Sequence, residues 1–177
     1  MDDRFELLLM RHGEAEDYAE GGDARRPLSA AGHADTRAMG TALRAMGLVP
    51  HAVVASPLLR AQQTARNVVD GIGTSLDPIA TDGQLVPSAT PSSTIAMLHA
   101  HVQSLGQRGM ARLLAVGHNP SVTSTVGQYV CGGPALAFNV APGDLAHLHV
   151  QMRDGRARGV VLGFYPAASI VALRGDG

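Results

Sequence analysis

The chain has 177 residues, 45% of them hydrophobic and 16% charged, which is the composition of a globular protein and argues against disorder. Fourteen basic and fifteen acidic side chains leave a formal net charge of −1, so no overall field draws nucleic acid or an anionic membrane to the surface. The length fits a single domain that spans residues 1–177.

The sequence has few features that indicate a cellular compartment. The one cysteine, Cys131, cannot form an internal disulfide, and the first residues lack the apolar core of a signal peptide. No stretch reaches the roughly 18 to 20 uninterrupted apolar residues of a membrane span. We therefore expect a cytoplasmic protein with no membrane or nucleic-acid partner. We also expect Cys131, beside two glycines, to be a small buried core residue.

The first predicted strand ends in a polar motif. Phe5 to Met10 is a short apolar run, typical of a buried strand, and it leads directly into Arg11-His12-Gly13. After a polar loop, Ser29 is suited to cap a helix from about Ala30 to Met46. Gly47 then ends that helix.

A second strand and helix follow. His51 to Ala55 is apolar, and Ser56-Pro57 predicts the start of a helix that runs to about Ile72. Arg60 would lie in the first turn of this helix. A weaker strand is expected near Ile79.

The next part of the chain again predicts helices on either side of a short apolar strand. A helix is expected from Pro91 to about Leu105, and an apolar strand from Arg112 to Val116. That strand also ends in a polar loop, Gly117-His118-Asn119-Pro120. A helix from about Ser121 to Val130 comes next.

Two alternating segments close the chain, Asp144 to Met152 and Gly159 to Tyr165, with a turn signal at Asp154-Gly155. They predict a hairpin at one edge of the sheet. Alternation of strands and helices before it predicts a three-layer α/β/α sandwich with a mainly parallel sheet and an antiparallel edge hairpin. Ligands bind such sheets where the carboxyl ends of the strands meet.

Four side chains should converge at that edge. Arg11 and His12 follow one strand and His118 follows another. Arg60 follows a third strand by a short turn. Two guanidinium groups and two imidazoles suit a phosphoryl group, because Arg pairs with phosphate oxygens in bidentate fashion and stays charged near neutral pH. The sequence thus predicts an oxyanion site.

The motifs around these residues resemble those of the histidine phosphatase superfamily, which has the phosphoglycerate mutase-like fold, over nearly the whole chain. Within it, the chain is most similar to the SixA-type phosphohistidine phosphatases. The resemblance rests on four segments in the family's order: Leu9-Met10-Arg11-His12-Gly13-Glu14, Arg26-Pro27-Leu28-Ser29-Ala30-Ala31-Gly32, Ser56-Pro57-Leu58-Leu59-Arg60-Ala61-Gln62-Gln63-Thr64-Ala65 and Val116-Gly117-His118-Asn119-Pro120.

The resemblance implies a metal-independent phosphatase that needs no cofactor. His12 would attack phosphorus, and water would then hydrolyse the phosphohistidine intermediate. The catalytic and phosphoryl-holding residues are implied to be His12, Arg11, Arg60 and His118. Further substrate-binding candidates are Arg26, which could equally form a surface salt bridge, Gly13 and Asn119.

One position departs from the family pattern. Many members carry a carboxylic acid after the third strand to protonate the leaving group, and the matching place here is Gln84. An amide cannot donate that proton, so the acid stays unassigned among Glu14, Glu16, Asp17 and Asp82.

The missing acid bears on the substrate. An imidazole leaves more readily than an alkoxide, so Gln84 favours phosphohistidine in a protein, for example a histidine phosphotransfer domain, and a function in signal transduction. Two alternatives stay open: a phosphomonoesterase acting on a small sugar or nucleotide phosphate, and a non-catalytic phosphohistidine-binding module. No metal site is expected, because His147 and His149 share a strand face without further ligands nearby.

Overall fold

The computed structural model describes residues 4–76, 78–106, 110–133, 139–153 and 156–173. Its six strands are β1 (Arg4–Arg11), β2 (Ala52–Ala55), β3 (Ala80–Thr81), β4 (Ala111–Gly117), β5 (Leu145–Arg153) and β6 (Arg156–Tyr165). Its α-helices are α1 (Ala30–Ala45), α2 (Leu59–Ile72), α3 (Pro91–Ser104), α4 (Ser121–Cys131) and α5 (Ala167–Ala172), and two short 3-10 helices are η1 (Asp23–Arg25) and η2 (Gly83–Leu85).

The strands form one mixed sheet in the order β3-β2-β4-β1-β5-β6. Strands β1 to β4 run parallel to one another, whereas β5 pairs antiparallel with β1 and β6 antiparallel with β5. The predicted mainly parallel sheet with an antiparallel hairpin at one edge is therefore confirmed. The turn expected at Asp154-Gly155 lies outside the described residues.

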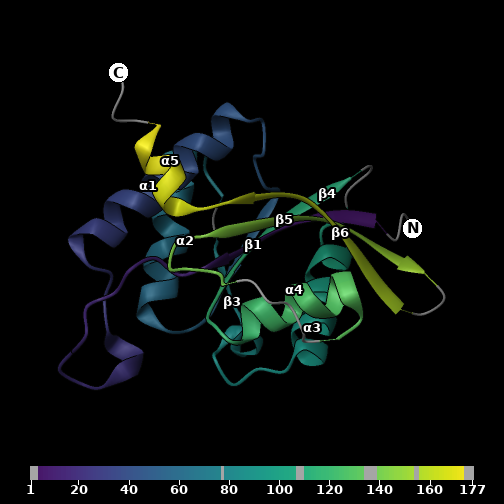
Figure 1. Ribbon diagram of the computed structural model, residues 1–177, viewed down its shortest axis with the longest axis horizontal. Helices are drawn as coiled ribbons and strands as arrows, with labels where there is room; N and C mark the ends of the chain where they lie inside the picture. The colour runs from purple at the N-terminus through teal and green to yellow at the C-terminus, as the bar shows by residue number, and fades with distance from the viewer. Residues whose placement is uncertain (1–3, 77, 107–109, 134–138, 154–155, 174–177) are drawn as a thin grey trace.

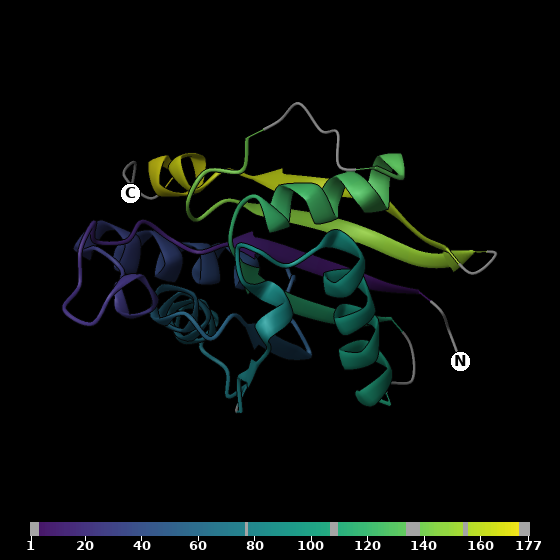
Figure 2. The ribbon, with the colours of Figure 1, turned by 90° about the horizontal axis from the view of Figure 1, so that it is seen from below.

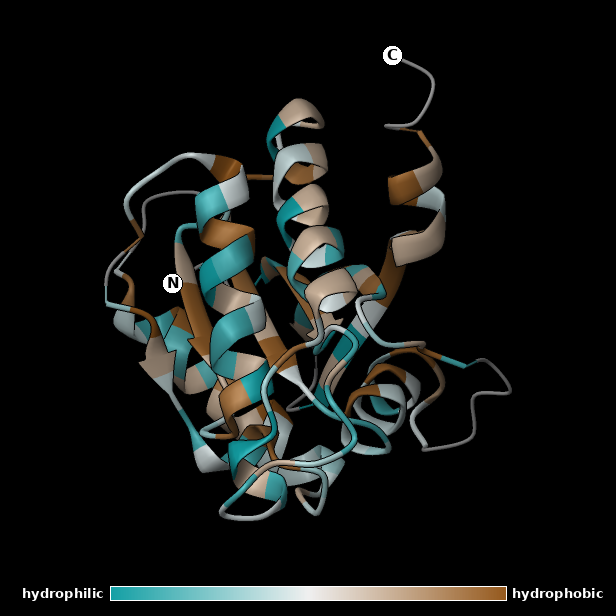
Figure 3. Cartoon of the chain, turned by 90° about the vertical axis from the view of Figure 1, so that its left-hand side faces the viewer, coloured by the Kyte–Doolittle hydropathy of each residue, from teal (hydrophilic) through white to brown (hydrophobic). Residues whose placement is uncertain are grey.

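Helices cover both faces of the sheet, which gives the three expected layers (Figures 1 and 2). On one face, α1, α2 and α5 pack with alternate strand residues such as Leu8 and Met10. On the other face, α3 and α4 pack with Leu7 and Leu9. Figure 3 shows brown, hydrophobic strands between helices that carry teal, hydrophilic segments alongside tan and brown ones. In the described part of the chain, no helix has the length and apolarity needed to cross a membrane.

The register of the parallel strands brings their carboxyl ends to one level. Arg11 at the end of β1 lies opposite Gly117 at the end of β4, and Ala55 at the end of β2 lies opposite Val116. The backbone continues this alignment, because His12 N donates to Gly117 O at 3.0 Å. The polar loops that follow these strands therefore begin side by side, as the sequence predicts.

Local signals set several helix ends. Ser29 caps α1 as expected, with its hydroxyl accepting from Gly32 N at 3.0 Å, and Gly47 follows that helix at φ 71°. The expected start of α2 at Ser56-Pro57 is wrong, since the helix begins at Leu59. Ser56 is instead fully buried beneath the site described below. Helix α5 and η1 were not expected.

The α1 and α2 helices cross at two glycines. A Cβ added at Gly40 would lie 2.2 Å from Val68 O, and one added at Gly71 would lie 2.2 Å from Arg37 O. Only glycine lets the backbones come this close. This contact fixes α2, and with it Arg60, relative to the rest of the layer.

Candidate active site

The four predicted side chains do meet at the carboxyl end of the sheet. Arg60 Nε donates to His12 Nε2 at 3.3 Å, although the two residues are 48 positions apart. The rings of His12 and His118 have centroids 4.7 Å apart and are tilted by 52°. Arg11 is the last residue of β1, immediately before His12. The convergence expected from the strand ends is thus present.

The backbone orients the His12 imidazole. Its Nδ1 lies 2.7 Å from Gly13 O, and because a carbonyl oxygen only accepts, Nδ1 carries the proton. The lone pair is therefore on Nε2, the atom that faces the pocket and Arg60. Gly13 is required here, because a Cβ would lie 2.6 Å from Thr36 Cγ2. Its N–H donates to Thr64 Oγ1 at 3.0 Å and holds the loop in place.

Both imidazoles are kept neutral. Burial, together with the nearby Arg60, Arg11 and Arg26, lowers the pKa of His12 to about 4, although the bond to Gly13 O raises it. Burial also lowers the pKa of His118 to about 3, with His12 and Arg60 adding to the effect. A neutral imidazole has the free lone pair that a nucleophile needs.

Two buried nitrogens at the site have no hydrogen-bond partner among the described residues: His118 Nδ1 and Arg11 Nε. The other sides of both groups are held, because His118 Nε2 lies 2.9 Å from Ser56 Oγ and Arg11 Nη1 donates to Val140 O at 2.8 Å. Buried polar groups normally find partners. Nitrogens left open beside a guanidinium cluster are what an oxyanion would satisfy.

Asp23 is a site residue that the sequence reasoning missed. It lies on η1, and its Oδ2 accepts from Arg60 Nη2 at 3.1 Å while its backbone oxygen accepts from Arg60 Nη1 at 2.8 Å. Its Oδ1 accepts from Arg26 Nη1 at 3.0 Å. Arg26 and Arg60 together lower the pKa of the Asp23 carboxyl below its usual value. The aspartate is thus an anion held between two arginines.

The remaining substrate-binding candidates have protein partners. Arg26 forms the Asp23 salt bridge and donates from Nε to Glu16 O at 2.6 Å, and it lies close enough to influence His12. Asn119 donates to Val140 O at 3.0 Å and accepts from Thr123 Oγ1 at 3.0 Å. Its amide thus braces the loop before α4.

In the described part of the chain, none of the four carboxylates considered as the leaving-group acid forms a hydrogen bond with His12. Gln84 is exposed on η2, where its backbone N donates to Asp82 Oδ1 at 2.8 Å. Glu14 accepts from Ser29 Oγ at 2.9 Å, and Asp82 lies 3.5 Å from His101. Glu16 and Asp17 are exposed on the loop.

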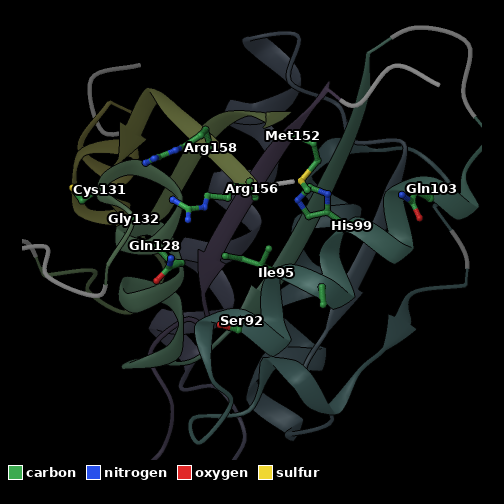
Figure 4. A pocket seen from close by; sticks show the side chains of 12 residues that line it. Ser92, Ile95, His99, Gln103, Gln128, Cys131, Gly132, Met152, Arg156 and Arg158 are labelled. Carbon is green, nitrogen blue, oxygen red and sulfur yellow. The ribbon is translucent and has the colours of Figure 1, made fainter. Parts of the chain in front are cut away.

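A groove of about 660 Å³ lies elsewhere, between α3, α4 and the hairpin (Figure 4). Its lining includes Ile95, His99, Gln128, Cys131, Arg156 and Arg158. Arg11, His12, Arg60 and His118 do not line this groove. The candidate active site is therefore identified from the chemistry of its side chains and not from the volume of a groove. The expectation that Cys131 is buried is wrong, because its thiol is exposed at this rim.

Metal ligands do not gather at either place. Among the residues that the structure describes, no three His, Cys, Asp or Glu side chains are close enough together to hold an ion. His147, weighed above as a ligand, is buried and lies with Nε2 3.2 Å from Glu6 Oε2. It belongs to an ion-pair cluster with Arg112.

Comparisons with known proteins identify the family of this chain. The family model for the histidine phosphatase superfamily (branch 1) matches residues 7–85. Phosphohistidine phosphatase SixA of Escherichia coli (strain K12) is 30% identical over 129 residues, which cover 73% of this chain and 76% of the relative.

Solved structures share the fold. The protein histidine phosphatase SixA complexed with tungstate superposes with a TM-score of 0.80 at 24% identity, covering 94% of this chain and 99% of that chain. A phosphoserine phosphatase of Entamoeba histolytica, complexed with phosphoserine, gives a TM-score of 0.66 at 14% identity, with 92% and 98% covered. The chain therefore belongs to branch 1 of the histidine phosphatase superfamily and is a hydrolase of that family.

Proposed function

We propose that this chain hydrolyses phosphohistidine in a protein, with His12 as the nucleophile and Arg11, Arg60 and His118 holding the phosphoryl oxygens. The observation that carries the proposal is the His12 imidazole, which is neutral, has its proton fixed on Nδ1 by Gly13 O and turns Nε2 toward Arg60. The similarity to SixA supports the substrate class.

The first step transfers the phosphoryl group. The Nε2 lone pair of His12 forms a new P–N bond while the bond to the substrate nitrogen breaks, and its electron pair returns to that nitrogen. Charge on the equatorial oxygens is stabilised by Arg11 and Arg60. The open His118 Nδ1 supplies a further donor when the ring is protonated or in that tautomer.

The second step regenerates the enzyme. Water attacks phosphorus, the P–N bond to His12 breaks, and its electron pair returns to Nε2. The water loses a proton to the solvent or to the departing phosphate. His12 leaves as a neutral imidazole that keeps its proton on Nδ1, next to Gly13 O, so this step needs no acid from the protein.

Phosphohistidine and phosphate esters differ in the group that leaves phosphorus. Expelling an alkoxide needs a proton donor, and general acid catalysis contributes about 10² to 10⁴ in rate. Gln84 cannot supply that proton, and Asp23 is held as a carboxylate by Arg26 and Arg60. An imidazole already protonated on its other nitrogen leaves without one. The site is therefore better suited to a phosphoramidate than to a sugar phosphate.

The test compares substrates in one assay. Steady-state hydrolysis of a phosphohistidine-bearing phosphotransfer protein is measured beside p-nitrophenyl phosphate and a sugar phosphate, with His12→Ala as control. We expect the phosphoprotein to have the highest kcat/KM and His12→Ala to abolish its turnover. Higher kcat/KM for the sugar phosphate would establish the phosphomonoesterase instead.

A second measurement separates enzyme from binder. Rapid quenching with ³²P-labelled substrate should trap an acid-labile label on the wild-type protein and none on His12→Ala. A chain that binds the phosphoprotein but never acquires label would be a phosphohistidine-binding module.

A further inference from the structure

We propose that Asp23 determines specificity at this site: its carboxylate accepts a hydrogen bond from the leaving imidazole of a phosphohistidine and disfavours phosphate esters. The inference rests on the proposed function and adds a residue and a mechanism of selection to it.

The side chain of Arg60 contacts both Asp23 and His12, and so links the two residues. Arg60 directs Nε to His12 Nε2 at 3.3 Å and both terminal nitrogens to Asp23, at 2.8 Å and 3.1 Å. The carboxylate is thus separated from the attacking atom by the width of one guanidinium. A phosphoryl group on Nε2, with a leaving group opposite, extends over a similar span.

The carboxylate also faces the solvent. Its side chain is 61% exposed, whereas that of Arg60 is only 6% exposed. The Asp23–Arg26 pair is partly exposed on both sides and contributes little to stability, whereas the Asp23–Arg60 pair joins an exposed carboxylate to a buried guanidinium. Both bonds place the negative charge of Asp23 next to the guanidinium groups of the site.

That charge discriminates between substrates. Phosphate esters bring two negative charges and no N–H on the leaving oxygen, so the carboxylate only repels them. In its protonated, cationic form, a phosphohistidine carries a proton on the ring nitrogen that is not bonded to phosphorus. Asp23 can accept a hydrogen bond from this N–H, which stabilises the cationic, reactive form of the phosphoimidazole.

The chemistry needs no general acid. His12 Nε2 forms the new P–N bond, the substrate P–N bond breaks, and its electron pair goes to the ring nitrogen that held phosphorus. The proton on the other ring nitrogen stays there, next to Asp23. The product is a neutral imidazole, which agrees with an amide at Gln84.

The test uses Asp23→Asn, which keeps the shape and an acceptor oxygen for the arginines but removes the charge. Asp17→Asn is the matched control, since Asp17 is an exposed carboxylate of the same loop. For wild type and both variants, kcat/KM is measured with N-phosphoimidazole and with p-nitrophenyl phosphate, and tungstate is measured as an inhibitor.

We expect Asp23→Asn to lower kcat/KM for N-phosphoimidazole by about 10- to 100-fold, the factor that a hydrogen bond to a charged group contributes. With p-nitrophenyl phosphate, kcat/KM should stay the same or rise, and tungstate should inhibit more tightly. Asp17→Asn should leave the substrate ratio unchanged.

The opposite outcomes are distinct. A loss of kcat/KM by the same factor for both substrates would mean that Asp23 only positions Arg60, and an unchanged kcat/KM for both would mean that Asp23 plays no part in the reaction. Either result overturns the inference while the proposed function stands. A wild-type enzyme that prefers the ester overturns both, and this is seen before any variant is compared.

Discussion

The neutral His12 imidazole has a cost in stability that a substitution should reveal. An unfolded histidine titrates near 6.5, whereas His12 titrates at about 4 in the folded chain. Between these values the unfolded chain binds a proton that the folded chain excludes, so stability falls as the pH falls through this window and the full cost is reached below about 4. His12→Asn has no such proton to exclude.

The magnitude follows from the shift. At about 1.4 kcal/mol per pKa unit, the complete cost is about 3 kcal/mol, and at pH 5 about 2 kcal/mol of it is already present. For a chain of this length, that corresponds to roughly 4 to 8 °C in Tm. His12→Asn should therefore gain about this much on wild type between pH 8 and pH 5, while it loses turnover at both.

The assay is thermal unfolding at a series of pH values, with phosphate-free buffers so that no anion binds the pocket. Thr64→Val is the control, because it removes the hydroxyl that accepts from Gly13 N at the same site and adds no titrating group. Its difference from wild type should not vary with pH. Parallel Tm curves for wild type and His12→Asn would refute the reasoning, because His12 would then titrate alike in both states.

Three further outcomes are expected. Gly40→Ala should lower the free energy of unfolding in urea by roughly 1 to 3 kcal/mol or more, because the added Cβ would clash with a backbone carbonyl oxygen. Gly83→Ala is the control, because a Cβ added there meets no other atom. Equal losses of stability in the two variants would contradict the packing argument. Arg60→Lys should lower kcat/KM for p-nitrophenyl phosphate by about 10² to 10³ with little change in Tm, since an ammonium cannot bridge His12 and the phosphoryl group; near-normal activity would count against a bidentate role. Gln84→Glu should raise kcat/KM for a sugar phosphate by about 10-fold or more and leave that for p-nitrophenyl phosphate little changed, so equal gains for both esters would argue against a leaving-group effect.

The strand ends were predictable because their signals are local. Short apolar runs ending in Arg11-His12 and in Gly117-His118 indicate buried strands with polar tips, and parallel pairing then requires those tips to meet. The cap at Ser29 depends only on the residues that follow it. Structural features that depend on one short segment could therefore be predicted from the sequence alone.

The missed features depend on contacts between distant segments. Asp23 is one of several acidic residues in a polar loop, and only the fold brings it to Arg60, 37 positions later. Ser56-Pro57 looks like the start of a helix, but the Ser56 hydroxyl also contacts His118, 62 positions away, which no local pattern reveals. Cys131 ends α4 at the rim of a groove that no sequence pattern marks.

The central place of β1 has a consequence for how the chain folds. Leu7 in β1 pairs with Leu113 in β4 on one side and with Leu148 in β5 on the other, both of which follow much later in the chain. Pairings over such sequence separations are slow to form, because the entropy of closing a long loop is lost before the contacts are gained. During synthesis, β1 must therefore wait until β4 and β5 have been made before it can take its place in the sheet. His12, the proposed nucleophile, is translated before both of these strands, yet the site around it can assemble only after them.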